Sequence, residues 1–553
     1  MTRTGSELLA DSLHAYGLES FFYLIGGPMV EATEAAVRIG LRGIDVRDER
    51  AGTFAAVALS RLRQEPAVVL ACSGPGTTNT VTGVSHAFVD GAPVVVIGGS
   101  AARHHQDRGG FQATDQVAIM KPITKWAHQV QTVREIPEAV RRALDVARTG
   151  SPGPVYLDLP ADVLHDVTDI AVELRPPIGA LRPPADDSLV RKAIDLLEAA
   201  DRPVVIAGSG VIWSRAWDAL VDFAEASRIP VYTTPMARGV IPEDHPTMFP
   251  GARSTAFRES DCLLVVGTRS TYVINWLLPP VMSATSRLIE INIDPAALST
   301  FRSADVAIQA DATMALGQLA AELRRRGWEA GHGAWIERLA AVHESARTKL
   351  REAAATPSQP MHPLSLCAAL DGWLPRDAVL VVDGHEILGF SRRAIVARLP
   401  GHTLGPGPYG TMGVGLPFAL GAKVARPDVP VVVLTGDGAL GYHLLELDTA
   451  VRHGLPVVVV VSNNGGWAGG ERTDRPGRAL GYTPYERLAE ALGCWGSKVT
   501  EPSQLVAAFD QALDFTLKEC RPAVVNVVVS TAQAGGRSFT ESRPGQQQSY
   551  DPV

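Results

Sequence analysis

The sequence predicts an α/β protein built from three doubly wound, mainly parallel sheets. Short apolar segments rich in valine alternate with amphipathic segments, which is typical of parallel sheets covered by helices on both faces. Two proline-containing stretches, 175–187 and 353–363, interrupt this alternation and are predicted to be linkers. The predicted strands include 67–71, 93–97, 203–207, 262–266, 379–383, 429–434 and 457–461.

The two linkers divide the chain into three segments, each long enough for one sheet. We expect domains at 1–174, 188–350 and 364–530, followed by a tail at 531–553. The tail is polar and poor in aliphatic residues, so we do not expect it to pack as core. It is either a frayed end or a lid over a ligand, and its composition favours the frayed end.

Composition and charge exclude several classes of protein. The 553 residues carry 51 Lys and Arg against 59 Asp and Glu, a net charge of −8, which argues against binding a nucleic-acid polymer through a basic surface. Five dispersed cysteines without a CxxC pair fit reduced thiols and argue against a thiolate metal site. No apolar run approaches the roughly 20 residues that span a bilayer, and the first residues lack the pattern of a signal peptide. We therefore expect a cytoplasmic protein with no membrane partner.

The most informative pattern is a pair of polar motifs that end two successive apolar strands. Gly436, Asp437 and Gly438 follow the first strand, and Asn464 and Gly466 follow the second, with a predicted helix between them. Because the carboxyl ends of parallel strands meet at one edge of a sheet, the two motifs are expected to lie together. One carboxylate, one amide oxygen and the Gly466 carbonyl suit a Mg²⁺ ion that also binds diphosphate and water. Each motif alone is ordinary turn chemistry, but their joint occurrence at this spacing favours a binding site.

A second candidate residue lies in the first domain. Glu49 stands at a strand-to-helix junction, before a helix of small residues predicted at 51–62. A first-turn glutamate is also an ordinary complement to the helix dipole. Met412 lies in the glycine-rich stretch 404–415, where a core methionine is an ordinary alternative to a functional one.

The paired motifs resemble the diphosphate-binding motif of thiamine-diphosphate enzymes. The resemblance covers essentially the whole chain, in the order pyrimidine-binding domain, central domain and diphosphate-binding domain, as in the group of acetolactate synthase, oxalyl-CoA decarboxylase and benzaldehyde lyase. It implies thiamine diphosphate and Mg²⁺ as cofactors, with Asp437, Asn464 and the Gly466 carbonyl as metal ligands. It also implies that the coenzyme lies between domains of two subunits, so the minimum assembly is a homodimer and a homotetramer is expected.

The resemblance also implies roles for residues of the first domain and for Met412 of the third. Glu49 matches the glutamate that binds the pyrimidine ring and drives its tautomerism, and Met412 matches the residue that wedges between the two rings and bends the coenzyme. Gln112 holds a position that faces the reacting carbon. Gly26 and Asn79 lie in loops that resemble the pyrimidine-binding loops, and they complete the expected cofactor contacts together with the glycines beside Asp437.

Several stretches favour a coenzyme A thioester as substrate. Residues 236–246 and 251–255 resemble oxalyl-CoA decarboxylase and 2-hydroxyacyl-CoA lyase, where this region helps to bind nucleotide, which also makes ADP a candidate ligand of the central domain. Arg253 offers a fork of donors to a phosphate, or is an ordinary surface arginine. Trp467 and Arg472, in the glycine-rich basic loop after the metal site, are expected to cover the CoA chain.

Differences from the sequence patterns of related enzymes narrow the range of expected substrates. Oxalyl-CoA decarboxylases have Tyr-Glu where this chain has Phe111 and Gln112, and a tyrosine where it has Trp467, which argues for a bulkier and less charged acyl group. The acetolactate synthase pattern has a glutamate at Ala113. Stretches shared with benzaldehyde lyase, at 112–118 and 122–127, indicate a carbon–carbon lyase or carboligase.

The expected reaction is therefore cleavage of a branched 2-hydroxyacyl-CoA, such as 2-hydroxyisobutyryl-CoA, to formyl-CoA and a ketone or aldehyde. Glu471 and the imine of the coenzyme are the candidate general bases, since the amide of Gln112 has no useful pKa. The alternatives are an oxalyl-CoA decarboxylase-like, acetolactate-synthase-like or benzaldehyde-lyase-like activity, the last two without CoA. A non-catalytic paralogue is disfavoured because every expected cofactor residue is present.

Overall fold

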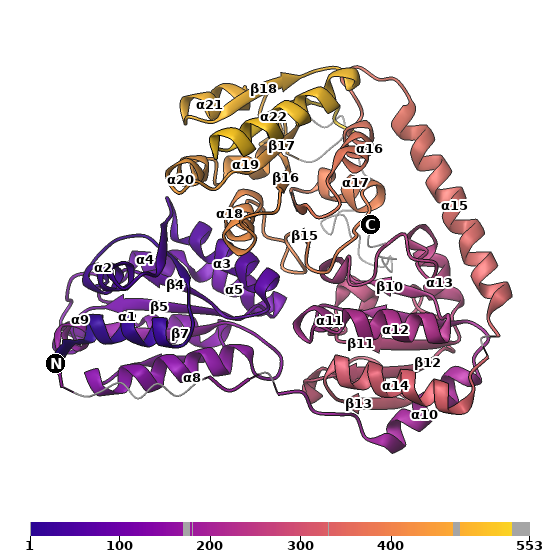
Figure 1. Cartoon of the computed structure of the whole chain (residues 1–553), viewed down its shortest axis with the longest axis horizontal. Helices are drawn as coiled ribbons and strands as arrows, with labels where there is room; N and C mark the ends of the chain where they lie inside the picture. The colour runs from indigo at the N-terminus through magenta and orange to yellow at the C-terminus, as the bar shows by residue number, and fades with distance from the viewer. Residues whose placement is uncertain (1, 170–176, 180, 330, 468–475, 533–553) are drawn as a thin grey trace.

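A computed structural model describes residues 2–169, 177–179, 181–329, 331–467 and 476–532. The chain forms three sheets of six, five and six strands, each covered by helices (Figure 1). Every strand pair within these three sheets is parallel. The predicted α/β class and three-sheet architecture are confirmed.

The first sheet has the strand order β3-β2-β4-β5-β7-β6. A short antiparallel pair, β1 (Arg3–Thr4) with β8 (Val167–Thr168), ties the start of the domain to its end. The strands are β2 (Ser20–Tyr23), β3 (Arg42–Asp45), β4 (Ala67–Ala71), β5 (Val94–Ser100), β6 (Trp126–Gln129) and β7 (Val155–Pro160). The helices are α1 (Gly5–Ala15), α2 (Val30–Arg38), α3 (Glu49–Arg63), α4 (Pro75–Asn79), α5 (Val81–Asp90), α6 (Arg103–Gln106), α7 (Gln116–Met120), α8 (Ile136–Arg148) and α9 (Ala161–His165).

The central sheet has the order β10-β9-β11-β12-β13. Its strands are β9 (Pro203–Ala207), β10 (Val231–Thr233), β11 (Cys262–Val266), β12 (Arg287–Asn292) and β13 (Val306–Gln309). Its helices are α10 (Asp187–Glu198), α11 (Gly210–Trp213), α12 (Trp217–Ser227), α13 (Arg253–Glu259) and α14 (Ala312–Arg326).

The long helix α15 (Gly333–Ala355) runs along the edge of the molecule from the central domain to the last one (Figure 1). Its final residues, 353–355, belong to the stretch that the sequence predicts to be a linker. These three residues are alanines, the strongest helix formers, so the helix continues until the proline-containing segment that follows. The connection is therefore shorter than predicted.

The third sheet has the order β15-β14-β16-β17-β19-β18. Its strands are β14 (Val379–Asp383), β15 (Thr403–Leu404), β16 (Val431–Gly436), β17 (Val458–Asn463), β18 (Trp495–Val499) and β19 (Ala523–Val528). Its helices are α16 (Pro363–Trp373), α17 (Glu386–Ala394), α18 (Gly415–Ala425), α19 (Asp437–Gly441), α20 (Glu446–Arg452), α21 (Tyr485–Ala491) and α22 (Leu505–Glu519).

The first and third domains pack together through α3 and α18, which lie side by side in Figure 1. A Cβ atom at Gly421 of α18 would lie 2.0 Å from the carbonyl oxygen of Ala55 of α3, so only glycine permits this approach. One hydrophobic core, which contains Phe54 and Phe418, continues across the two domains. The helix that begins at Glu49 and the helix that follows Met412 are therefore packed as one unit.

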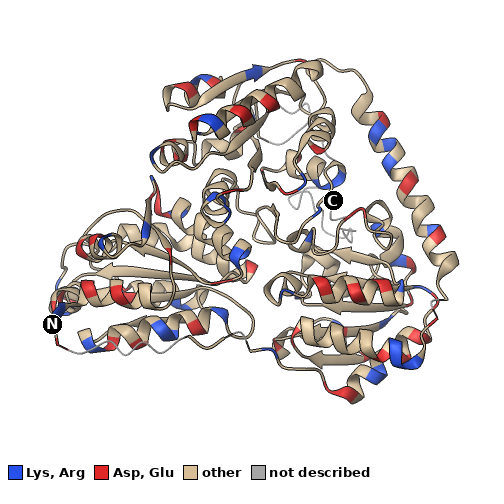
Figure 2. Cartoon of the chain, in the orientation of Figure 1, with Lys and Arg blue, Asp and Glu red and all other residues tan. Residues whose placement is uncertain are grey.

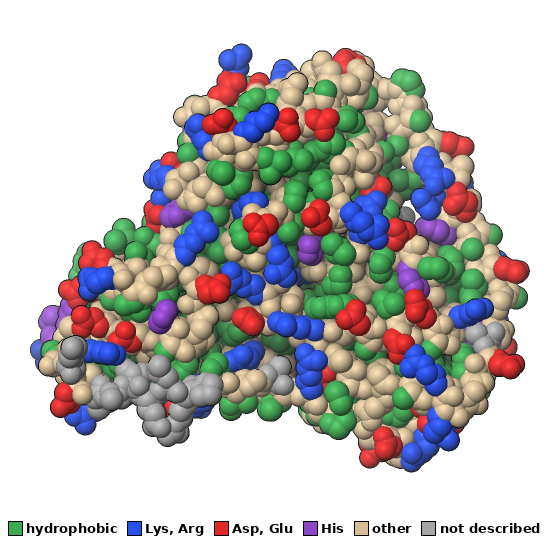
Figure 3. Space-filling view, in the orientation of Figure 1, with side chains coloured by type: hydrophobic (Ala, Val, Ile, Leu, Met, Phe, Trp, Pro, Cys, Tyr) green, Lys and Arg blue, Asp and Glu red, His purple; other side chains and the backbone are tan. Residues whose placement is uncertain are grey.

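Charged side chains are distributed over the whole surface. Figure 2 shows Lys and Arg interspersed with Asp and Glu along the helices of all three domains. The face seen in Figure 3 likewise mixes both signs of charge with apolar side chains. Among the described residues, no helix combines the length and the hydrophobicity that crossing a membrane requires.

Candidate active site

The two polar motifs of the third domain meet at one edge of the sheet. β16 pairs in parallel with β17, and Gly436 lies opposite Ser462. Asp437 is the first residue of α19, and Asn464 directly follows β17. The backbone N–H groups of the glycine after Asn464 and of Gly466 lie close enough to the Asp437 carboxylate to lower its pKa. The expected pairing of the motifs thus follows from parallel strand order.

Asp437 has the properties of a cation ligand. Its side chain is only 3% exposed, and Oδ2 has no hydrogen-bond partner in the described chain. Burial raises the pKa of the carboxyl to about 6, and the neighbouring backbone N–H groups only partly oppose that rise. A buried carboxylate oxygen without a partner is costly, so a divalent cation at this position would satisfy it.

The rest of the donor set also fits Mg²⁺. Asn464 Oδ1 accepts a hydrogen bond of 3.1 Å from the Gly466 N–H, which leaves one lone pair of the amide oxygen for a metal. The described residues contain no cluster of three or more His, Cys, Asp and Glu side chains that could bind a metal. A metal in this region would therefore rely on one carboxylate together with amide and carbonyl oxygens, a hard-oxygen set that leaves room for phosphate and water.

Glycines beside the motif leave space for a neighbouring aromatic ring and strand. A Cβ atom at Gly438 would lie 2.7 Å from the half-buried ring of Trp467, and one at Gly466 would lie 2.6 Å from the carbonyl oxygen of Arg478. Trp467 also contacts Tyr442 edge-on, with 6.0 Å between ring centroids. By contrast, a Cβ atom at Gly436 would meet open space, which leaves the strand end accessible.

Glu49 lies buried in the first domain, at the start of α3. It is 5% exposed, and Asn79 Nδ2 donates a hydrogen bond of 3.0 Å to its Oε2. A Cβ atom at Gly76 would lie 3.1 Å from Glu49 Oε1 and 2.3 Å from the sulfur of Cys72. Gly26 approaches the same cysteine, since its Cβ atom would lie 2.7 Å from that of Cys72. The structure thus brings Gly26, Glu49 and Asn79 together around Cys72.

Sequence reasoning missed Cys72 as part of this site. Burial, and secondly the Glu49 carboxylate, raise the pKa of its thiol, so the cysteine stays neutral. Gln116 was missed as well: its side chain is 2% exposed, its Oε1 accepts a 2.6 Å hydrogen bond from the Gly74 N–H, and its Nε2 donates to Asp158 at 2.7 Å. Gln116 thus fixes the turn between Cys72 and Asn79.

Gln112 and Phe111 lie on the loop before α7. Ser73 donates a hydrogen bond of 2.6 Å to Gln112 Oε1, which connects this residue to the Glu49 pocket. Gln112 has a φ of +58°, a strained conformation for a residue other than glycine. Phe111 beside it is 86% exposed in the single chain.

The remaining candidate site residues lie in separate parts of the chain. Met412 lies half-buried in the loop between β15 and α18. Arg253 begins α13, stacks over the ring of Phe257 at 4.5 Å and donates to the Val273 carbonyl at 3.3 Å. Glu471 and Arg472, like the tail from 533 onwards, lie outside the described residues.

Within the described part of the single chain, no hydrogen bond or ion pair joins Glu49 to Asp437 or Asn464. The expectation that two subunits complete the site stays a prediction.

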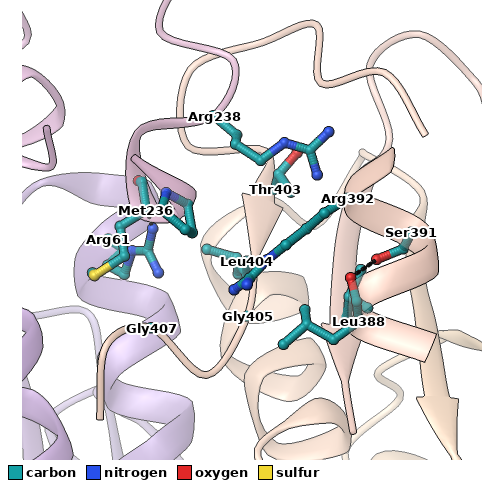
Figure 4. Close-up of a pocket in the computed structure, with 12 residues that line it drawn as sticks. Arg61, Met236, Arg238, Leu388, Ser391, Arg392, Thr403, Leu404, Gly405 and Gly407 are labelled. Carbon is teal, nitrogen blue, oxygen red and sulfur yellow. Dashed lines mark hydrogen bonds between the residues drawn. The ribbon is translucent and has the colours of Figure 1, made fainter. Parts of the chain in front are cut away.

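A small, partly open pocket where the three domains meet was not anticipated. Arg61 of α3, Arg238 of the central domain and Arg392 of α17 surround it, and Figure 4 shows the Arg392 side chain reaching toward Gly405. Arg61 is 2% exposed, and its Nη2 donates to the Met236 carbonyl at 3.0 Å, whereas Nη1 has no hydrogen-bond partner in the described chain. Arg238 already forms an ion pair with Glu243 at 2.7 Å, and Arg61 interacts with Asp90, so part of the positive charge around the pocket is compensated within the chain.

Comparison with known proteins agrees with this geometry. Three family models match the chain: the N-terminal thiamine pyrophosphate binding domain at residues 3–119, the central domain of thiamine pyrophosphate enzymes at 190–319 and their C-terminal binding domain at 389–527. The chain is 32% identical to 2-hydroxyacyl-CoA lyase 2 of Bos taurus, over 96% of this chain and 90% of the relative.

Two further relatives match over a similar share of the chain. A 2-hydroxyacyl-CoA lyase of Oryza sativa subsp. japonica is 33% identical, over 95% of both chains. The acetolactate synthase large subunit IlvG of Mycobacterium tuberculosis is 35% identical, over 96% of this chain and 97% of the relative. With all three domain models matched in order and relatives aligned along its length, the chain belongs to the thiamine pyrophosphate enzyme family.

Proposed function

We propose that this chain is a carbon–carbon lyase that cleaves 2-hydroxyacyl-CoA thioesters with thiamine diphosphate and Mg²⁺. The observation that carries the substrate class is the arginine-lined cavity, which lies beside the loop that leads to Met412. Relatives with the name 2-hydroxyacyl-CoA lyase support the same class. The described residues offer no separate support for ADP in the central domain, so ADP is not part of the proposal.

The coenzyme would be held at two ends by residues already described. Asp437, Asn464 and the Gly466 carbonyl would hold Mg²⁺, and through it the diphosphate. When bound, thiamine diphosphate supplies the carbanion that attacks a carbonyl and the cation that accepts the electrons of the broken bond. Glu49, oriented by Asn79, would hold a proton at the pyrimidine ring, and its burial keeps water from competing for that hydrogen bond.

The arginines would bind the anionic part of the CoA substrate. Arg61 keeps one unpartnered donor, Nη1, although its guanidinium also interacts with Asp90. Met236, Leu388 and Leu404 add apolar surface to the cavity, which suits the aliphatic part of an acyl-CoA. From Leu404 the chain continues directly into the loop that carries Met412, so substrate bound here would extend toward the coenzyme.

We infer that the acyl group is bulky and weakly charged, as in 2-hydroxyisobutyryl-CoA, and that the products are formyl-CoA and a ketone. Phe111, Gln112 and Trp467 support this inference, because none of them adds a charge to the site. Gln112, anchored to Ser73, would orient a carbonyl or hydroxyl group. We also infer a homodimer, since the 86% exposure of Phe111 leaves this side of the site open in the single chain.

An acetolactate-synthase-like activity is the second candidate, and the 35% identity to IlvG favours it. One set of assays separates the two. The purified protein with thiamine diphosphate and Mg²⁺ is incubated with 2-hydroxyisobutyryl-CoA, with formyl-CoA plus acetone, and with pyruvate. We expect acyl-CoA cleavage and its reverse; acetolactate from pyruvate without any reaction of the thioesters would contradict the proposal.

A further inference from the structure

Two buried histidines contact the residues on either side of Met412. His86, at the middle of α5, places Nδ1 3.1 Å from the hydroxyl of Thr411. His443, which follows α19, places Nδ1 2.7 Å from the carbonyl oxygen of Gly413. His86 is 0% exposed and His443 is 6% exposed. The loop is therefore held from the first domain on one side and from the third domain on the other.

A single aromatic ring connects both histidines to the helix that begins at Glu49. Phe54 of α3 is 1% exposed and meets His86 edge-on, with 5.7 Å between ring centroids. It meets His443 in the same manner at 5.9 Å. Because Phe54 lies about one and a half helical turns after Glu49, the helix and the loop share one rigid contact.

The loop cannot fix its own position. Gly407, Gly410 and Gly413 have φ angles of +57°, +71° and +89°, in the left-handed region that favours glycine. Three such residues within seven give the unbound loop many alternative conformations. The described loop from 405 to 413 also lacks any helix or strand that would hold it. Its position must come from side chains that contact it, and these include Tyr272 of the central domain, whose hydroxyl donates to the Pro408 carbonyl at 2.7 Å.

The carboxyl group of Asp90 lies beside the other ring nitrogen of His86. Asp90 Oδ2 is 3.0 Å from His86 Nε2, although the angle is not that of a hydrogen bond, and both side chains are fully buried. A carboxylate only accepts, so a proton on Nε2 faces Asp90, and in the neutral ring Nδ1 then accepts from the Thr411 hydroxyl. The guanidinium of Arg61 interacts electrostatically with Asp90. A Cβ atom at Gly407 would lie 2.3 Å from Asp90 Oδ1, so the same carboxylate also abuts the start of the loop.

His443 acts on the other side as a neutral donor. Burial lowers the pKa of its ring, and the nearby Asp48 and the Gly413 carbonyl only partly oppose this effect. The neutral ring donates from Nδ1 to the Gly413 carbonyl, and Nε2 has no partner in the described chain. The ring is thus fixed by one hydrogen bond and by its contacts with Phe54 and Tyr442.

We propose that His86 and His443 are positioning residues that hold the Thr411–Gly413 segment in place between the first and third domains. They would set the position of Met412, while Asp437 and Asn464, which would hold Mg²⁺ and the diphosphate, are not among their contacts. The inference rests on the coenzyme assigned to this site but not on the acyl-CoA substrate. It predicts that losing the hydrogen bond of either histidine makes the loop more mobile and lowers kcat. Binding of Mg²⁺ and diphosphate through Asp437 should be largely kept.

The first test removes one hydroxyl group. Thr411→Val keeps the side-chain shape and leaves His86 Nδ1 without a donor, whereas Thr411→Ser restores the donor. Hydrogen exchange of the 405–413 amides is measured in the holoenzyme, together with kcat and the dissociation constant of thiamine diphosphate. For Thr411→Val we expect exchange about two- to tenfold faster and kcat lower by a similar factor, with recovery in Thr411→Ser. Unchanged exchange in Thr411→Val would overturn the role of His86, whatever substrate the enzyme uses.

The second test compares three histidine variants. His443→Leu removes the donor to the Gly413 carbonyl, and His443→Asn replaces it with an amide donor. His332→Leu is the matched control, because His332 is 5% exposed with an unpartnered Nε2 but lies in the central domain. We expect faster loop exchange and lower kcat in His443→Leu, partial recovery in His443→Asn and no change in the control. If His332→Leu and His443→Leu changed loop exchange and kcat equally, His443 would contribute only to overall stability and would not be a positioning residue.

Discussion

The contact between α3 and α18 makes a sharp prediction for Gly421→Ala. The added Cβ atom would lie 2.0 Å from the Ala55 carbonyl oxygen and 2.7 Å from its carbon, at least about 1 Å closer than a normal contact. Backbone atoms cannot rotate away, so the two helices must separate, at a cost of about 1–3 kcal/mol. Since α3 begins at Glu49 and α18 follows Met412, the separation also displaces both of these candidate coenzyme-binding residues.

We therefore expect Gly421→Ala to lower the free energy of unfolding. It should also weaken thiamine diphosphate binding, by about tenfold for each 1.4 kcal/mol that the holoenzyme loses beyond the loss of the coenzyme-free protein. Denaturant unfolding and a coenzyme titration measure the two quantities. Gly317→Ala is the control: Gly317 is exposed inside α14 with no atom near its Cβ position, so alanine should stabilise by up to about 1 kcal/mol without changing the coenzyme's affinity. If Gly421→Ala kept both stability and coenzyme affinity, the coupling of the two domains through these helices would be refuted.

Other outcomes follow from single side chains. Glu49→Gln should abolish turnover while thiamine diphosphate and Mg²⁺ still bind, as calorimetry would record; retained turnover would remove the role of Glu49. Arg392→Ala should raise the KM for the acyl-CoA about tenfold or more, through loss of a charge-assisted hydrogen bond, while Arg338→Ala, whose arginine forms an exposed ion pair with Glu259, should not. Burial raises the pKa of Glu446 to about 7 from an ordinary value near 4.5, so stability should fall by up to about 3 kcal/mol as the pH rises from 4.5 to 7. Glu446→Gln should flatten that part of the pH profile, and an unchanged slope in urea unfolding would show that another group is responsible.

The fold and the meeting of the two polar motifs of the third domain could be predicted because both depend on local sequence. All-apolar strands such as 457–461 indicate a sheet buried on both faces, and the polar motifs after successive parallel strands must meet at one edge. Glu49 and Asn79 are 30 residues apart and belong to different elements. A role in cofactor binding was expected for both only through a family resemblance, and their hydrogen bond to each other was not predicted, since spacing alone does not bring them together.

What could not be predicted depends on packing between domains. Arg61, Arg238 and Arg392 come from three separate sheets, and nothing in their neighbouring residues marks them as parts of one cavity. The contacts of His86 and His443 with the loop that carries Met412 likewise form only after α3 and α18 pack together. The predicted end of α15 was wrong for a simpler reason. The prediction gave more weight to the prolines after the helix than to the helix propensity of the three alanines at 353–355.

Calorimetric titration of the purified protein with thiamine diphosphate, with and without Mg²⁺, tests the central claim most directly. We predict saturable binding that requires the metal in the native protein and that disappears in Asp437→Ala, whose carboxylate is lost while the fold, followed by circular dichroism, is kept. Failure of the native protein to bind the coenzyme with Mg²⁺ in excess, or equal binding by Asp437→Ala, would contradict the account.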